Sequence, residues 1–437
     1  MEVINASAAG IDVGSRSHFV AIGQNPEDVR EFGVYTEDHH KLVNWLSSRG
    51  ISTVAMESTG SYWQTLFSAL QRAGFEVLLV NGRQIKNVKG KTDVKDCQWI
   101  QRLHCLGLLT GSFLPSTQVE RLRTCQRHRD WLVEECSRLC NKMQKSLRLM
   151  NVRLDVVLSD VMGVSGRKIT EAILNGCRDG HQLARLAHSS VKKSKEEIAL
   201  GLQGNWNAEL LFELSQSYDL YRIIEAKITE CDHLLEKLLR DFTQHIQKPS
   251  HGRKVINKRA WKHQHKFDVS SLSHQMVGVD LFSIEGISRS TVMTFLSEVG
   301  NDIHKFKTAK QFTSWLRLAP NNKISGGKIL SSRTPRGKNY LAASLRNAAN
   351  SIGLMKIGAL KTFFSRIAFK KGRAAAITAT ARKLATIIWS MVTRQLPYKP
   401  YDQTTYSRKV KESVIFNIKA KMKRLDIQPN EILATFS

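Results

Sequence analysis

The sequence of 437 residues lacks any continuous apolar run of 18 residues, so we expect no membrane-spanning helix. Its first residues, Met1–Asn5, lack the basic segment and apolar stretch of a secretion signal. Seven cysteines, an odd number without the spacing of a disulfide framework, are typical of a reducing cytoplasm. The chain is too long for one ordinary core, and its 42% hydrophobic content is that of a folded protein, so two or three domains are expected.

Acidic residues are missing from a long stretch near the C-terminus. Between Asp302 and Asp402 there is none, whereas 20 residues are Lys or Arg. Residues 301–437 carry 27 basic and 5 acidic residues, so they supply +22 of the chain's net charge of +28. A field of one sign over such a length indicates a polyanionic partner. Nucleic acid is favoured over a membrane surface because no amphipathic anchor or lipidation motif accompanies the charge.

Residues 1–110 have the alternation of an α/β domain. The pattern predicts three strands in a hairpin-like run, followed by alternating helices and strands. This order is that of a ribonuclease-H-like mixed sheet with flanking helices. The expected strands are 3–11, 18–23, 29–35, 52–56 and 76–80, and the expected helices are 37–48, 62–73 and one that starts near Asp93.

Four acids belong to this domain. Asp12 lies at the end of the first strand, where Gly14 and Ser15 leave space beside it, and Glu57 ends the fourth strand. Parallel strands bring their carboxyl ends to one edge of a sheet. Asp93 and Asp96 are three apart, so they share one face of the helix that they open. Carboxylates that converge there would suit Mg²⁺, with two ions clamping a phosphodiester. The alternative is that Asp12 caps a turn, Asp93 complements the helix dipole and Asp96 is solvated.

Residues 111–248 change to coiled-coil periods. Two long helices with such seams can pair as an antiparallel hairpin within the chain or between subunits. Cys136 and Cys140 are interpreted as core or seam residues because no second metal-binding pair lies near them. The basic insertion at 155–205 has no assigned role, and 249–275 has the composition of a basic linker. The seam positions are Leu132, Cys136, Leu139, Met143, Leu147, Met150 and Leu154 in the first helix and Tyr221, Ile224, Ile228, Cys231, Leu235, Leu238 and Phe242 in the second.

Residues 276–395 are predicted to form a mostly helical basic domain, followed by a basic tail at 396–437. The stretch 282–292 is similar to a helix-hairpin-helix turn, in which backbone N–H groups hold a DNA phosphate, although Ser288 replaces a usual glycine. Ser325 precedes Gly326 and Gly327, and this segment is either a phosphate-binding turn, a nucleophile or an ordinary hairpin turn. Six basic residues around it are candidates for phosphate binding, namely Lys323, Lys328, Arg333, Arg336, Lys338 and Arg346.

The order of these parts resembles a known family. An acidic α/β domain, a coiled-coil middle and a C-terminal basic block are shared with insertion-sequence transposases of the IS110 family. These recombinases have a RuvC-like DEDD domain and a separate domain that bears a serine. The C-terminal resemblance lies in Gly286-Ile287-x-x-x-Thr291, Leu318-Ala319-Pro320, Ser325-Gly326-Gly327-Lys328, Arg336-Gly337-Lys338 and Leu345-Arg346-x-Ala348-Ala349.

The resemblance implies that Asp12, Glu57, Asp93 and Asp96 are the DEDD acids and hold Mg²⁺, and that Ser325 is the nucleophile. It also implies a DNA transposase that is guided by a structured non-coding RNA. Such an enzyme would act as a dimer of dimers in the bacterial or archaeal cytoplasm, associated with the nucleoid. Three alternatives stay open: a metal-dependent nuclease of the Holliday-junction-resolvase kind without a serine step, a sugar-kinase-like ATPase, and a nucleic-acid-binding module with structural acids.

Overall fold

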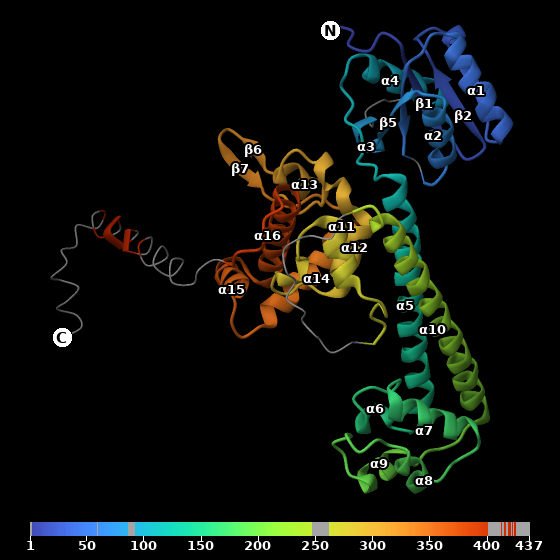
Figure 1. The fold of residues 1–437 in the computed structure, drawn as a ribbon, viewed down its shortest axis with the longest axis vertical. Helices are drawn as coiled ribbons and strands as arrows, with labels where there is room; N and C mark the ends of the chain where they lie inside the picture. The colour runs from blue at the N-terminus through green and yellow to red at the C-terminus, as the bar shows by residue number, and fades with distance from the viewer. Residues whose placement is uncertain are drawn as a thin grey trace. The chain divides into compact units, whose positions relative to one another are not determined.

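The computed structural model describes residues 2–58, 60–85, 92–246 and 262–400, and eight residues scattered between 412 and 424. The chain divides into two compact units, Met1–Leu114 and Pro115–Ser437, and each is described by itself (Figure 1). Residues 249–261 of the predicted linker and most of the predicted tail lie outside the described residues. Within the described residues, no helix combines the length and apolar character that crossing a bilayer requires.

The first unit is built on a five-stranded mixed sheet. The strand order is β3-β2-β1-β4-β5; β2 is antiparallel to both β3 and β1, and β4 is parallel to both β1 and β5. The predicted hairpin-like run followed by parallel strands is therefore confirmed. The strands are β1 (Ala8–Val13), β2 (Ser17–Ala21), β3 (Val29–Gly33), β4 (Thr53–Glu57) and β5 (Glu76–Val80).

The prediction that the first strand begins at Val3 is wrong. Val3 and Ile4 are 58% and 69% exposed and precede the sheet. The backbone N–H groups of Ile4 and Asn5 donate to the carbonyl of Cys105, at the end of a helix. This segment is thus tied to that helix, so its backbone groups are satisfied without pairing in the sheet.

Helices cover both faces of the sheet (Figure 1). On one face, α1 (Thr36–Ser48) and α2 (Trp63–Arg72) pack on the odd-numbered residues of β1, because successive side chains of a strand point to opposite faces. On the other face, α4 (Asp93–Cys105) packs mainly on β1 and also on β2 and β4. Its Ile100 joins a small cluster with Ala55, Val80 and Ile85, the last residue of the short α3 (Gly82–Ile85). The core of the first face includes Ile11, Val13, Leu42, Leu46, Val54, Met56, Leu66 and Leu70.

The second unit contains two long helices, α5 (Thr117–Leu149) and α10 (Ala208–Thr243). Arg129 pairs with Asp232, and Ser146, further along α5, bonds to Glu213, which is earlier in α10. The two helices therefore run antiparallel, which is the first of the two predicted arrangements. Of the predicted seam, Leu132, Cys136, Met143, Leu147, Tyr221, Ile228 and Leu235 are buried between them.

Both seams depart from a strict seven-residue repeat at their ends. The helix α5 ends at Leu149, and Asn151 has a φ of 58°, so Met150 and Leu154 belong to the turn and to the next helix. Near the end of α10, Leu239 and Thr243 are buried in place of the predicted Leu238 and Phe242. A straight helix drifts against a 3.5-residue repeat, and this drift moves the buried face on by one residue.

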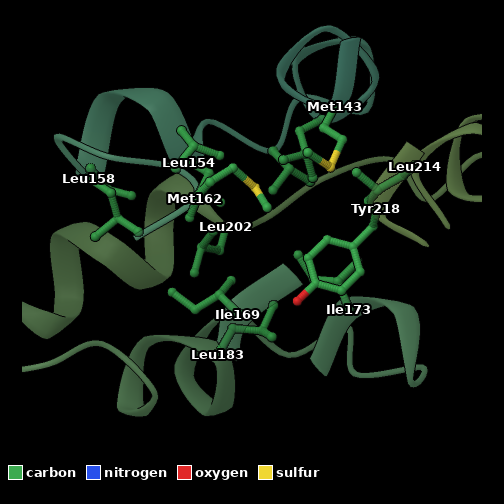
Figure 2. Close-up of a cluster of buried hydrophobic side chains, with 14 of the residues drawn as sticks. Met143, Leu154, Leu158, Met162, Ile169, Ile173, Leu183, Leu202, Leu214 and Tyr218 are labelled. Carbon is green, nitrogen blue, oxygen red and sulfur yellow. The ribbon is translucent and has the colours of Figure 1, made fainter. Parts of the chain in front are cut away.

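The predicted insertion at 155–205 forms a small helical subdomain that joins α5 to α10. Its helices are α6 (Leu154–Val157), α7 (Val164–Leu174), α8 (Gly180–Arg185) and α9 (Lys195–Gly201). Figure 2 shows their apolar side chains meeting those of the two long helices. The insertion is thus a structural part of the second unit. Labelled members of this cluster are Met143, Leu158, Met162, Ile169, Ile173, Leu183, Leu202, Leu214 and Tyr218.

The rest of the second unit is mostly helical, as predicted, with one two-stranded hairpin. It is joined to α5 by Glu298, which is 5% exposed and forms two hydrogen bonds with the guanidinium of Arg127, at 2.8 and 2.9 Å. Arg123 donates to the backbone carbonyl of the same Glu298. The elements are α11 (Val269–Val277), α12 (Arg289–Glu298), α13 (Ala309–Trp315), β6 (Lys323–Ser325), β7 (Lys328–Ser331), α14 (Tyr340–Leu354), α15 (Ala359–Lys371) and α16 (Arg373–Arg394).

A pair of buried histidines in the first unit makes its stability depend on pH. His18 of β2 and His39 of α1 have ring centroids 5.5 Å apart, and neither ring nitrogen of His18 has a hydrogen-bond partner among the described residues. Burial, together with the neighbouring His39, lowers the pKa of His18 from 6.5 to about 4. Between these pH values the unfolded chain binds more protons than the folded one. The contribution of His18 to the free energy of unfolding is therefore fully present above pH 6.5 and is lost as the pH falls toward 4.

We predict that the melting temperature of the first unit falls less steeply from pH 6.5 to pH 4 in a His18→Leu variant than in the wild type, because the variant removes this proton uptake on unfolding. The measurement is thermal denaturation across that range. His40→Leu, at an exposed position of α1, is the matched control and should keep the wild-type slope. Equal slopes for His18→Leu and the wild type would contradict the prediction.

Candidate active site

Asp12 and Glu57 are aligned by the pairing of their strands. The parallel register of β1 and β4 runs from Ala8 opposite Thr53 to Ile11 opposite Met56. The next step of that register sets Asp12 beside Glu57, at the carboxyl edge of the sheet. Both acids are half-buried. By alternation along the strands, both share a face with Gly10 and Ala55, which is the face covered by α4.

The backbone of α4 lies directly on β1 at Gly10. A Cβ atom added to Gly10 would lie 2.2 Å from the nitrogen of Gln101 and 2.5 Å from the carbonyl oxygen of Cys97. The side chain of Gln101 donates to the carbonyls of Ala8 and Ile22, which holds the helix on the strand. Only glycine permits a contact this close.

The direction of α4 brings its acidic end to the edge that carries Asp12. Nε2 of His104, near the end of the helix, lies 2.9 Å from the hydroxyl of Thr53, the first residue of β4. Cys97, two turns earlier in the helix, lies over Gly10. The helix therefore runs opposite to β1, and its first turn, with Asp93 and Asp96, lies toward the carboxyl edge.

The pKa of the Cys97 thiol agrees with this placement of the acidic end of α4. Burial raises the pKa of the Cys97 thiol to about 12, and the negative charges of Asp12 and Asp96 add to the rise. Both carboxylates therefore lie close enough to this one sulfur atom, between the strand and the helix, to disfavour its thiolate form. Asp96 is half-buried, whereas Asp93 is exposed. The helix begins at a side-chain cap, because the hydroxyl of Thr92 accepts the N–H of Lys95.

Glu57 leans toward the neighbouring strand β5. A Cβ atom added to Gly82, at the turn after β5, would lie 2.2 Å from Oε1 of Glu57. Within the described residues, no three His, Cys, Asp or Glu side chains form a group that could hold a metal ion. The structure thus brings the four acids to one edge of the sheet but not into a common ligand set. Residues 86–91, which lead into α4, lie outside the described residues.

Ser325 is the last residue of β6, in the second unit. It pairs with Lys328 of β7, and between them Gly326 and Gly327 have φ angles of 53° and 73°. Positive φ at both central residues defines a two-residue hairpin turn, for which glycine is favoured. The predicted hairpin-turn form of this segment is therefore confirmed, and every residue from Lys323 to Leu330 is exposed.

The predicted basic residues are on or near this hairpin. Arg333, Arg336 and Lys338 lie exposed between β7 and α14, and Arg346 is half-buried on α14. Arg317 is a further basic residue here that was not predicted, and its guanidinium donates to the carbonyl of Arg336. No sequence signal marks Arg317, because its φ of 55° and its place over the backbone of Gly337 arise only in the folded chain.

The segment that is similar to a helix-hairpin-helix turn has a defined geometry. Gly286 has a φ of 77°, and a Cβ atom there would lie 2.5 Å from the side chain of Ile352. The hydroxyl of Ser288, at the expected second glycine, accepts the N–H of Thr291 and caps α12. The element before Gly286 is a single 3-10 turn at Leu281–Ser283, whereas α11 has already ended.

Comparison with known proteins covers both ends of the chain. A DEDD family model described as "Transposase" matches residues 9–152, the range that contains the four acids. A second model, described as "Transposase IS116/IS110/IS902 family", matches residues 280–365, the range that contains Ser325.

This chain belongs to the IS110 family of transposases. Relatives include a "Probable family 20 transposase" of Pseudomonas aeruginosa, 27% identical over 124 residues, and the "Transposase for insertion sequence element IS1111A" of Coxiella burnetii, 30% identical over 121 residues. These matches cover 28% and 27% of this chain, and 36% and 33% of the relatives. The chain thus spans about a third of the length of these curated relatives.

The contact at Gly10 gives a test of how this family member positions its acidic helix. We predict that Gly10→Ala lowers the free energy of unfolding by about 1–3 kcal/mol, because the added methyl group pushes the α4 backbone off the strand. Chemical denaturation measures it. In the comparison variant Gly50→Ala a Cβ meets nothing within 4 Å, and only the φ of 67° opposes it, so the cost should be about 1 kcal/mol. A Gly10→Ala protein as stable as the wild type would refute the contact.

Proposed function

We propose that this protein is a DNA transposase that cuts and exchanges the strands of an insertion sequence. The observation that carries the proposal is the match of two transposase family models, in order, to the range with the four acids and the range with the serine. The net charge of +22 over residues 301–437 supports a nucleic-acid partner.

In this proposal the first unit is a RuvC-like domain of the ribonuclease-H kind, in which Asp12, Glu57, Asp93 and Asp96 would hold two Mg²⁺ ions. The donor set fits, because all four are carboxylates, which hard cations prefer, and all belong to one edge of the sheet. When bound, the metal supplies neutralisation of the charge that develops on the scissile phosphate. The tilt of Glu57 toward Gly82 then means that its side chain rotates before all four acids share a ligand set.

The proposed nucleophile is the hydroxyl of Ser325. Its oxygen attacks the scissile phosphorus and loses its proton, the bond from phosphorus to the leaving DNA oxygen breaks, and that strand departs as a hydroxyl. A hydroxyl of a second strand then attacks the phosphoserine, which rejoins the DNA and releases Ser325. The bond energy is conserved between the two steps. The acids and Ser325 belong to different units of the chain, and we propose a composite site whose two parts come from different subunits.

The basic side chains would hold DNA backbone phosphates beside the serine. Lys323 and Lys328 flank Ser325 on the hairpin, and Arg333, Arg336, Lys338 and Arg346 extend the positive surface. Phosphate binding by these groups makes affinity fall steeply with salt. The turn from Gly286 to Ser288 would bind a further phosphate through backbone N–H groups.

We further propose a structured non-coding RNA as the guide that selects donor and target, and a dimer of dimers as the working assembly. The support is the family resemblance. The proposed setting is the nucleoid of a bacterial or archaeal cytoplasm.

The second candidate function is a structure-specific DNA nuclease without a covalent serine step. One observation favours it: Gly326 and Gly327 alone explain the hairpin at Ser325, as a two-residue turn. In that case the acids alone would direct a water molecule onto the phosphate.

We predict that Ser325→Ala abolishes both strand exchange and a covalent DNA–protein adduct, with a loss of roughly a thousandfold or more, because no other group replaces the attacking oxygen. The assay follows exchange between plasmids that carry the DNA flanking this reading frame, in Mg²⁺, with and without RNA transcribed from that flank. The matched control is Ser332→Ala, an exposed serine just beyond β7, which should keep full activity.

Other outcomes of the same assay separate the alternatives. Full-rate, metal-dependent cleavage by Ser325→Ala without an adduct would establish the nuclease. Activity regained on mixing Asp12→Asn with Ser325→Ala protein is expected if the site combines two subunits. Strand exchange at full rate without the RNA would contradict the proposed guide RNA.

A further inference from the structure

Arg317 occupies a backbone position that favours glycine. Helix α13 ends in a Schellman motif, in which the N–H of Arg317 donates to the carbonyl of Ser314 at 2.8 Å and that of Leu318 donates to the carbonyl of Thr313 at 3.0 Å. The turning residue of this motif adopts the left-handed region, and Arg317 has a φ of 55°. Glycine is usual there because a side chain strains that conformation. The contacts of the arginine side chain must therefore offset this strain.

The side chain of Arg317 contacts the segment that follows the serine-bearing hairpin. Its guanidinium donates to the carbonyl of Arg336 and lies against Gly337, where an added Cβ atom would be 1.2 Å from Nη1. Gly337 has a φ of 137°, so this second position also favours glycine. Arg317 precedes β6 and Arg336 follows β7. The contact therefore joins the chain that enters the hairpin to the chain that leaves it.

The hairpin itself has little other support. On either side of the arginine, Leu316 and Leu318 are 0% and 1% exposed, so the core fixes that end of the contact. Every residue from Asn321 to Leu330 is exposed. Between the two segments, the backbone N–H of Asn321 donates to the carbonyl of Arg333 at 3.0 Å. The base of the hairpin is thus held by backbone pairing and by one buried-end anchor, the arginine.

We propose that Arg317 is a positioning residue for Ser325: it closes the base of the hairpin and does not itself bind DNA. The inference rests on the proposed function, in which Ser325 is the nucleophile. Closing the base limits the positions that the hairpin can take before another surface covers it. A guanidinium suits this role because its planar set of donors holds an acceptor in a fixed direction. The same contact fixes the backbone from which Arg336 and Lys338 extend.

The alternative role for Arg317 is that of one more phosphate ligand. Two observations favour the positioning role. Arg317 is half-buried, whereas the proposed phosphate ligands Arg333, Arg336 and Lys338 are exposed. Its guanidinium also donates to a backbone carbonyl of the protein, which is a structural use of the donor.

The first experiment separates the two roles by comparing rate with affinity. Arg317→Gly removes the guanidinium but adopts a φ of 55° without strain, so its unfolding midpoint should match that of the wild type. We expect the rate of DNA–protein adduct formation at saturating DNA to fall at least about tenfold. Arg317→Lys keeps the charge without the planar donors and should lose as much rate. The matched control is Lys310→Ala, an exposed lysine on α13, which removes one charge and should keep the wild-type rate. The DNA affinity of Arg317→Gly should equal that of this control.

The second experiment needs neither DNA nor metal. Rapid hydrogen exchange followed by mass spectrometry should show faster exchange over residues 321–331 in Arg317→Gly than in the wild type, with the rest of the chain unchanged. Gly337→Ala places a methyl group on the guanidinium and should also speed this exchange. Its effect should be smaller in the Arg317→Gly background, where no guanidinium is left to displace.

Three results would each overturn the inference: a wild-type rate for Arg317→Lys, an unchanged rate with weakened DNA binding for Arg317→Gly, or unchanged hairpin exchange in Arg317→Gly. A wild type that forms no adduct would contradict the proposed function instead. The exchange measurement would then still decide whether Arg317 holds the hairpin closed.

Discussion

The contact between the backbone of α4 and Gly10 determines where the acids of the first unit lie. Because the strand has no side chain at that point, the helix lies directly on the sheet, with Gln101 bonded to the strand backbone. Any larger residue would move the helix outward and carry Asp93 and Asp96 away from Asp12. A single glycine thus couples the local geometry of a strand to the placement of carboxylates about 85 residues later in the sequence.

The sequence was a good guide to the elements of this unit and a poor guide to their contacts. The order and limits of the later strands follow from apolar runs bounded by turn residues, which are local signals. The edge that carries the acids follows from the parallel order of β1 and β4. The contacts of Gly10 with α4 and of Gly82 with Glu57 are tertiary, and a glycine in a sequence does not reveal what lies against it. The same holds for Arg317, which packs on Gly337.

In the second unit, buried charge explains what periodicity could not predict. Arg129 and Asp232 occupy positions in step with the seam, between Cys125 and Leu132 in α5 and between Ile228 and Leu235 in α10, and both are buried. The apolar periodicity did not predict these two residues as buried, because charged residues are expected outside a core. Removing one partner would leave the other charge buried and unpaired, which is costly, so the pair favours this register of the hairpin over shifted ones.

The acids and Ser325 belong to secondary structures of very different stability. The acids belong to a five-stranded sheet with helices on both faces, whereas Ser325 ends a strand of an isolated two-stranded hairpin. Two strands alone are marginally stable in water, and this hairpin exposes Ile324, Ile329 and Leu330 at 62%, 63% and 69%. A nucleophile needs a fixed position relative to the phosphate that it attacks. The serine would therefore gain that position only when another surface covers the hairpin. The chemistry proposed for this family member then depends on assembly as much as on the residues that carry it out.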